Sequence, residues 1–286
     1  MIAGLYISGD SGTDILEVRG SMTKKWVRYE HAGEQGFGLL AQGVINGHSG
    51  ELFQNSQASG ETLQLQEVRL LAPCEPTKIV AMWNNFHQLA EAQDLIAPEF
   101  PFYFIKPASC VVGHGDEILH PEGYDGRLIY EGELGVVIGK TCKGVSRDEV
   151  ADYVLGYTCI NDVTAIHLLF KYDAFPQWTR AKSFDTFGVI GPCIAELDDP
   201  DTLYVKTVVN GEERQNYPVS DMFFSPLDLV SLIAGDMTLD PGDVIACGTS
   251  LGVKTMKPDT TVSVIIEGVG TLTNRYQPDT ASQSED

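Results

Sequence analysis

The stretch Tyr130–Lys140, YEGELGVVIGK, has the alternating pattern of a β-strand. Successive side chains of a strand point to opposite faces, so Glu131 and Glu133 share one face, which continues as apolar Val137. Two interpretations fit these carboxylates. Either they face solvent, or they lie together in the interior, where no Lys or Arg beside them in sequence relieves their repulsion. A divalent cation would relieve it, and hard oxygen ligands favour Mg²⁺, Mn²⁺ or Ca²⁺.

The composition is typical of a globular protein, with 286 residues of which 43% are hydrophobic and 21% charged. A net charge of −21 without any basic run argues against nucleic acids and anionic membranes as partners. The sequence lacks an apolar stretch near the roughly 20 residues that cross a bilayer, and its first residues lack signal-peptide features. The six cysteines are widely spaced without a CxxC pair, so we expect reduced thiols in a cytoplasmic protein.

Turn and proline signals divide the chain into three parts. Residues 1–72 predict a small N-terminal cap domain of short strands, with one helical stretch around Phe37–Val44. Residues 73–276 predict a larger domain, and the polar residues 277–286 a disordered tail.

Strands outnumber helices along the chain, which predicts a strand-rich α+β fold rather than a doubly wound sheet. Asn210-Gly211 predicts a tight hairpin, and Ser225-Pro226 predicts the start of a helix with Ser as the cap. Asp162 ends a buried strand pattern just before a helical pattern. It is either a helix cap or a third oxygen ligand for the cation of Glu131 and Glu133.

Four segments in order, YEGELGVVIGK, GYTCINDVTA, QWTRAKSFDTFGVIGP and GDVIACGTS, together resemble the fumarylacetoacetate hydrolase family. The resemblance covers roughly residues 75–275. It implies a mixed β-sandwich roll that is usually dimeric and holds Mg²⁺ or a similar cation. It also implies hydrolysis, decarboxylation, isomerisation or elimination of 2-oxo acids, as in aromatic catabolism.

Matched by position, the family's metal ligands correspond to Glu131, Glu133 and Asp162. Lys182 matches the substrate lysine, and Thr249 matches a residue that contacts the substrate carboxylate. Lys106 matches the lysine of an F-x-K-P segment.

These assignments agree with elementary chemistry. A 2-oxo carboxylate chelates a cation, which polarises its carbonyl group. Lys182 would add a second positive charge where an enolate develops. Together with this chemistry, the resemblance implies a Mg²⁺-dependent, homodimeric hydrolase that cleaves a C–C bond in an acylpyruvate or dienoate-type acid.

The chain departs from the family in two places. The family's N-Y-x-x-H-x-x-E dyad, which activates water, corresponds to Asn85, Leu89 and Ala92 here. His87 and Glu91 lie nearby, four residues apart, and are the substitute candidates for that dyad. After Asp162 the family's Arg, Asp and Gln become Ile166, His167 and Leu169, which implies a more apolar distal group on the substrate.

Three alternatives follow. Decarboxylation or isomerisation needs less water activation than hydrolysis, so the altered dyad favours both. A catalytically weak relative would bind a carboxylate with the metal and not convert it. A serine hydrolase fits GTSLG at Gly248–Gly252, but the helix that must follow a nucleophile such as Ser250 is missing from the pattern, and the cysteines carry no nucleophile signature.

Overall fold

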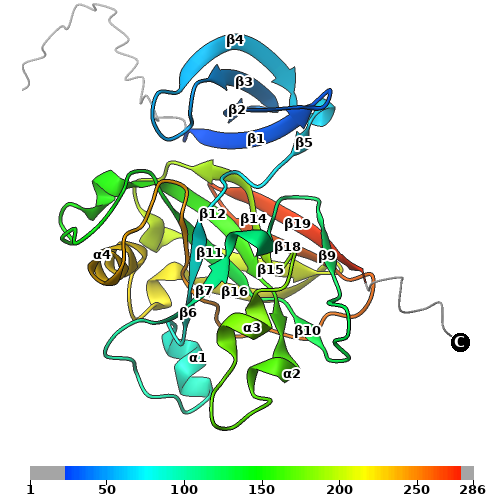
Figure 1. The fold of residues 1–286 in the computed structure, drawn as a ribbon, viewed down its shortest axis with the longest axis vertical. Coiled ribbons are helices and arrows are strands. Elements are labelled where there is room, and N and C mark those ends of the chain that lie inside the picture. The colour runs from blue at the N-terminus through cyan, green and yellow to red at the C-terminus, as the bar shows by residue number, and fades with distance from the viewer. Residues whose placement is uncertain (1–22, 278–286) are drawn as a thin grey trace, which may run out of the picture.

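The computed structural model describes residues 23–277. Their strands form two larger sheets and one two-stranded sheet (Figure 1). The fold is the predicted strand-rich α+β roll with a small N-terminal domain. Its strands are β1 Lys25–His31, β2 Glu34–Ala41, β3 Val44–Ser49, β4 Gln57–Gln64, β5 Arg69–Leu70, β6 Lys78–Trp83, β7 Phe102–Pro107, β8 Val111–Val112, β9 Glu117–Leu119, β10 Leu128–Ile129, β11 Gly132–Ile138, β12 Val154–Asp162, β13 Thr164–Ala165, β14 Gly188–Ala195, β15 Tyr204–Val209, β16 Glu212–Pro218, β17 Val244–Ala246, β18 Thr261–Ile266 and β19 Gly270–Gln277. Its α-helices are α1 His87–Ala92, α2 Ile166–Leu169, α3 Trp178–Lys182 and α4 Pro226–Asp236.

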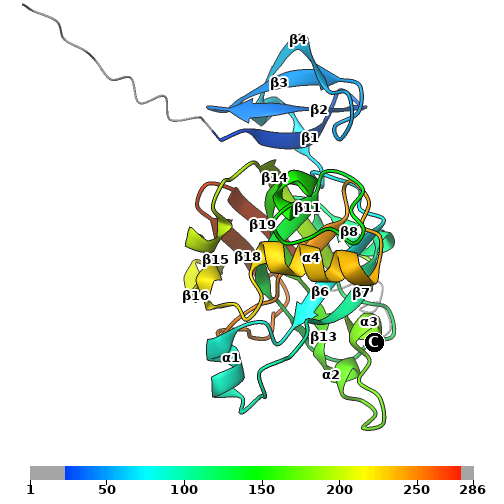
Figure 2. The ribbon, with the colours of Figure 1, turned by 90° about the vertical axis from the view of Figure 1, so that its left-hand side faces the viewer.

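The N-terminal strands β1 to β4 form an antiparallel meander at one end of the molecule (Figures 1 and 2). The helix expected around Phe37–Val44 is wrong, because β2 occupies Glu34–Ala41 and pairs with both neighbours. Gly36 and Gly38 disfavour a helix there, and strand pairing outweighs the apolar run that suggested one. Of the predicted tail, residues 278–286 lie outside the described part of the chain, as do residues 1–22 of the predicted cap.

The meander joins the large sheet through β1, whose Lys25 and Trp26 pair antiparallel with Ala195 and Ile194 of β14. The Trp26 indole also donates to the Glu196 carboxylate at 2.8 Å. The large sheet then runs β14-β12-β11-β17-β6-β7.

This sheet curls back on itself. β8 follows β7 after one short turn and pairs parallel with β14, so the two ends of the β14-to-β7 run meet. The curvature brings the inner faces of β7 and β12 together although three strands separate them. The interior is filled by residues such as Phe104, Val137 and Ile160.

The second sheet, β16-β15-β18-β19-β9, packs against the other face of β11 and β12. Leu134, Val136 and Ile138 of β11 lie in the core between the sheets. The predicted hairpin joins β15 and β16 through Asn210 and Gly211, both with positive φ. The predicted helix start is also confirmed, since Ser225 caps α4.

Candidate functional site: a buried acidic triad

The register of β11 and β12 places the three predicted ligands side by side. Gly132 pairs with Asn161 and Glu133 with Ile160, so the next position along the ladder sets Glu131 beside Asp162. The Asp162 amide donates to the Glu131 carbonyl at 2.8 Å, which extends the ladder by one step. Because alternate residues of a strand share a face, all three carboxylates point into the roll.

The three carboxylates form one cluster. Glu131, Glu133 and Asp162 each offer an oxygen, and these oxygens lie within 4.8 Å of one another. Asp162 and Glu133 are fully buried, and the Glu131 side chain is 15% exposed. The interior placement is therefore the correct one of the two interpretations of the Glu131–Glu133 pair, and Asp162 belongs to the cluster rather than to a helix cap.

Two buried lysines approach the cluster from other elements. Lys182, at the end of α3, donates to Glu131 Oε1 at 2.9 Å and to Asp162 Oδ2 at 2.7 Å. Lys106 of β7 donates to Asp162 Oδ1 at 2.5 Å and to the Lys182 carbonyl. The Lys182 ammonium also lies 5.5 Å from the centre of the Phe104 ring. Both lysines predicted for the site are thus in it.

The two lysines donate hydrogen bonds to Glu131 and Asp162. Among the described residues, no lysine donates to Glu133. Burial alone would raise the pKa of Asp162, but Lys106 and Lys182 lower it below its ordinary value. Burial, with Asp162 and Glu131, raises the pKa of Glu133 well above its ordinary value. Burial alone would lower the pKa of Lys182, but the three carboxylates raise it, so this lysine is a fixed positive charge.

The cluster fits a divalent cation. Among residues 23–277, its buried atom Glu133 Oε1 has no hydrogen-bond partner, while Oε2 accepts from the Gly248 amide at 2.8 Å. An unpartnered buried carboxylate oxygen is costly unless it coordinates something. When a cation keeps all three carboxylates ionised, they and the two ammonium groups leave one negative charge, which a divalent ion would turn into one positive charge. All-oxygen ligands suit Mg²⁺, Mn²⁺ or Ca²⁺.

Thr249 lies directly behind the cluster, in the turn after β17. Its hydroxyl donates to the carbonyl of Gly132, the residue between the two glutamates, at 2.9 Å. Sequence reasoning missed Gln215 and Tyr217 of β16, which contact the same peptide groups. A buried Gln on a strand carries no local signal of this role, because only the packing of the two sheets brings it here.

His87 and Glu91 lie in α1, away from this network. Both are exposed, and the His87 ring packs against Phe223 at 3.9 Å between ring centres. Within residues 23–277, neither side chain forms a hydrogen bond or ion pair with the triad. His167, which replaces a family Asp, is exposed and accepts from Arg127.

The described part of the chain gives no support to a serine or cysteine nucleophile. No helix follows Ser250 directly, and within the same residues its buried hydroxyl has no hydrogen-bond partner. All six cysteines are buried and unpaired. Burial raises the pKa of the Cys247 thiol well above its ordinary value, which disfavours the reactive thiolate.

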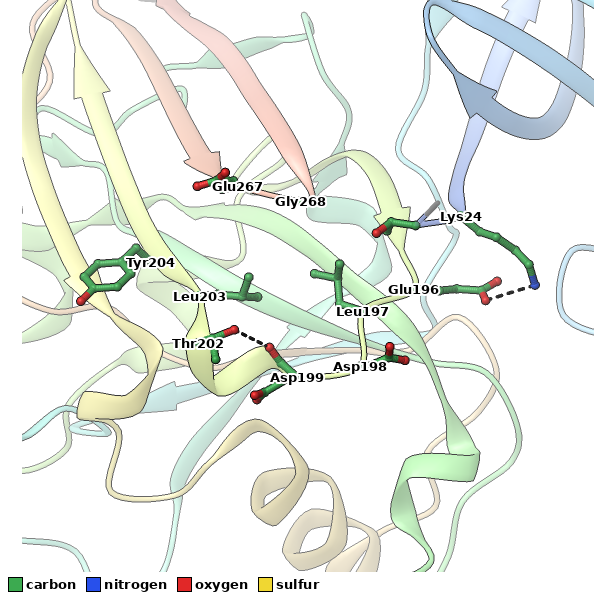
Figure 3. A pocket seen from close by; sticks show the side chains of 11 residues that line it. Lys24, Glu196, Leu197, Asp198, Asp199, Thr202, Leu203, Tyr204, Glu267 and Gly268 are labelled. Carbon is green, nitrogen blue, oxygen red and sulfur yellow. Dashed lines mark hydrogen bonds and ion pairs between the residues drawn. The ribbon is translucent and has the colours of Figure 1, made fainter. Parts of the chain in front are cut away.

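A separate hollow of about 610 Å³ lies where β1 meets the larger domain (Figure 3). Lys24 and Glu196 form an ion pair at 3.3 Å on its rim, and the Thr202 hydroxyl donates to the Asp199 carbonyl at 2.9 Å. None of its lining residues belongs to the triad or contacts it. Among the described residues, the helices are all too short or too polar to cross a membrane.

The fold and site are those of a strand-rich domain with a buried carboxylate cluster for a divalent ion. The sequence model described as "Fumarylacetoacetate (FAA) hydrolase C-terminal" matches residues 78–277, and "Rv2993c-like, N-terminal" matches residues 24–73. The chain belongs to the fumarylacetoacetate hydrolase family of enzymes.

Relatives in this family carry several activities. An uncharacterized protein of Archaeoglobus fulgidus is 46% identical over 215 residues, which cover 75% of this chain and 84% of the relative. Oxaloacetate tautomerase YisK of Bacillus subtilis is 36% identical over 235 residues, which cover 77% of each chain. The structure of 2-hydroxyhepta-2,4-diene-1,7-dioate isomerase from Mycobacterium marinum superposes with a TM-score of 0.82 at 35% identity, covering 90% of this chain and 99% of that one.

Proposed function

We propose that this protein is a divalent-metal-dependent enzyme that moves a proton within a 2-oxo acid, as a keto–enol tautomerase or isomerase. The observation that carries the proposal is the buried triad with an unpartnered Glu133 oxygen and two buried lysine side chains beside it. The similarity to an oxaloacetate tautomerase and to a dienedioate isomerase supports the same class of reaction.

The residues have distinct tasks in such a reaction. A cation held by Glu131, Glu133 and Asp162, with Mg²⁺ or Mn²⁺ as first candidates, would polarise the 2-oxo group. Lys182 holds a positive charge next to the position where the enolate oxygen gains negative charge, which stabilises the enolate. Thr249 binds the carboxylate group of the substrate. Lys106 fixes Asp162 and the Lys182 carbonyl, and so keeps Lys182 in place.

A proton shift fits the geometry better than hydrolysis does. Hydrolysis of an acylpyruvate needs a base that activates water beside the cation. His87 and Glu91 are exposed in α1, and no histidine of residues 23–277 forms a hydrogen bond with the triad. Keto–enol interconversion also adds a proton at C3 and removes one from the enol oxygen, but solvent can deliver and accept these protons, so this reaction needs no activated water as a nucleophile beside the cation.

C–C bond hydrolysis is the second candidate. His87 and Glu91 lie one helical turn apart in α1, an arrangement that suits a His–Glu pair. If that pair reached the substrate, it would cleave an acylpyruvate to pyruvate and a carboxylic acid. A His87→Ala variant then loses activity, whereas a proton shift at the triad does not depend on His87.

The deciding experiment offers the purified protein Mg²⁺ or Mn²⁺ with enol-form oxaloacetate and, separately, with acylpyruvates. We expect faster ultraviolet loss of the oxaloacetate enol and faster deuterium exchange at its C3 by NMR, without release of pyruvate from acylpyruvates. Glu133→Gln is the control, because it removes a ligand and keeps the shape of the side chain. Pyruvate and carboxylic acid in equal amounts would establish hydrolysis instead. If oxaloacetate protected the protein against thermal unfolding only when the metal is present, and was not converted, the protein would be a binding protein.

We also propose that two copies associate through an aromatic surface at the end opposite β1 to β4. Trp83, Phe102, Phe170 and Trp178 form a chain of ring contacts 5.4–6.2 Å apart around α3. Large apolar side chains are also exposed on the loops beside these four aromatic rings, namely Ile96, Phe100, Tyr172 and Phe175. Light scattering should give twice the mass of the chain, and Phe175→Asp should lower it, whereas Tyr204→Asp on β15 should not.

A further inference from the structure

A closed ring of hydrogen bonds surrounds Gly132, the residue between the two glutamate ligands. The Gly132 amide donates to Gln215 Oε1 at 3.1 Å. Gln215 Nε2 donates to the Thr249 hydroxyl at 2.8 Å, and that hydroxyl donates to the Gly132 carbonyl at 2.9 Å. The ring therefore begins and ends on the backbone that carries Glu131 and Glu133.

The Gln215 carboxamide has only one orientation that fits. Its side chain is buried, with 1% of the residue exposed, and Nε2 also donates to the Ser250 carbonyl at 3.1 Å. Turning the amide over would set its NH₂ against the Gly132 amide and its oxygen against a carbonyl. Because the amide group is planar, it holds β11 and the Thr249 turn at a fixed separation.

The Thr249 hydroxyl has one proton, which it donates in a hydrogen bond to the Gly132 carbonyl. To donate to a substrate carboxylate, Thr249 must turn that proton away from the Gly132 carbonyl. This carbonyl then keeps a partner, since the Tyr217 hydroxyl also donates to it from β16. Gly132 is buried, so water does not replace the hydrogen bond that its carbonyl loses when Thr249 turns away. Without Tyr217, substrate binding would leave a buried carbonyl unpaired.

We propose that Gln215 and Tyr217 are positioning residues with separate tasks. Gln215 holds the backbone of the metal ligands against the Thr249 turn, and Tyr217 frees the Thr249 proton for the carboxylate of the substrate. This inference deepens the proposed function and rests on it. The position between the two glutamates has no space for a side chain, because a Cβ at Gly132 would lie 2.0 Å from Thr207 Oγ1.

The test measures binding rather than turnover. Mn²⁺ affinity is measured by electron paramagnetic resonance, and pyruvate affinity by calorimetry on the Mn²⁺-loaded protein. Tyr217→Phe should leave Mn²⁺ affinity within about threefold and weaken pyruvate roughly tenfold, the effect of one unpaired buried carbonyl. Gln215→Met should weaken Mn²⁺ binding roughly 10- to 100-fold, as other substitutions behind metal ligands do. The exposed neighbours Tyr204→Phe and Asn216→Met should change neither affinity.

A double-mutant cycle separates positioning from simple loss of stability. In a Thr249→Val background, Tyr217→Phe should have no further effect on pyruvate, because no threonine proton remains to be released. Equal pyruvate affinity of Tyr217→Phe and the parent would overturn the role of Tyr217. An additive effect in the cycle would overturn it as well.

The role of Gln215 is tested by a second variant should Gln215→Met not fold. Gln215→Glu keeps the acceptor for the Gly132 amide and loses the donor to the Thr249 hydroxyl and to the Ser250 carbonyl, so the Thr249 turn is no longer held. We therefore expect this variant to retain Mn²⁺ and to bind pyruvate more weakly. Unchanged Mn²⁺ affinity in Gln215→Met, or unchanged pyruvate affinity in Gln215→Glu, would refute the role. A parent protein that binds no Mn²⁺ would instead refute the proposed function itself.

Discussion

Replacing Lys182 by methionine removes the positive charge that separates Glu131 from Asp162. Its Nζ lies 2.9 Å and 2.7 Å from their oxygens, and the lysine side chain is 1% exposed. Removing one partner from a buried ion pair costs roughly 3–5 kcal/mol, because the remaining charge stays buried. In a domain of this size one kcal/mol corresponds to about 2–4 °C, so we expect the metal-free variant to melt roughly 6–20 °C lower.

A cation should recover much of that loss. The variant keeps all three carboxylates and has one ammonium group fewer, so Mn²⁺ meets a more negative site. At about 100 times its dissociation constant, Mn²⁺ adds about 2.7 kcal/mol of stability. We therefore expect Mn²⁺ to raise the melting temperature of Lys182→Met more than that of the parent, while turnover of oxaloacetate is lost.

Calorimetric melting with and without Mn²⁺ checks both parts of the prediction. Lys140→Met is the matched control, because Lys140 is exposed just beyond the end of β11 and should change the melting temperature by little. A metal-free Lys182→Met protein that melted with the parent would refute the electrostatic reasoning. So would an equal response of both proteins to Mn²⁺.

Three further predictions concern other parts of the fold. Gly132→Ala should destabilise the protein by roughly 1–3 kcal/mol, because its Cβ would meet Thr207 Oγ1, and urea unfolding should show partial rescue by Thr207→Ala. Ser225→Ala should cost about 1 kcal/mol in the same assay, since it removes the N-cap of α4. Burial lowers the pKa of His114, whose Nδ1 accepts from the Thr273 amide at 3.2 Å. The unfolded chain takes up this proton near about pH 6.5 and the folded one only at lower pH, so this contribution is full above that pH and falls below it. The urea midpoint should therefore drop less between pH 7.5 and 5.5 in His114→Asn than in the parent.

The sequence by itself determined those elements whose signals are local, and it indicated oxygen ligands for the cluster. The alternation in Tyr130–Lys140 predicts β11 because side-chain direction in a strand follows from local backbone geometry. The hairpin at Asn210-Gly211 and the cap at Ser225 are equally local, and both were predicted. The apolar run at Phe37–Val44 was misinterpreted, because pairing with β1 and β3 decided its structure.

Only the tertiary structure decided which charges meet. Lys182 and Lys106 lie 51 residues after Glu131 and 56 residues before Asp162 in the chain, so sequence neighbours could not reveal that they relieve the repulsion. Closure of the sheet through β8 and β14 sets β7 against β12 and places Lys106 beside Asp162. The packing of the second sheet brings Gln215 and Tyr217 behind Gly132. Local geometry fixes where a side chain points along its strand, whereas the partners it meets depend on how distant strands close around it.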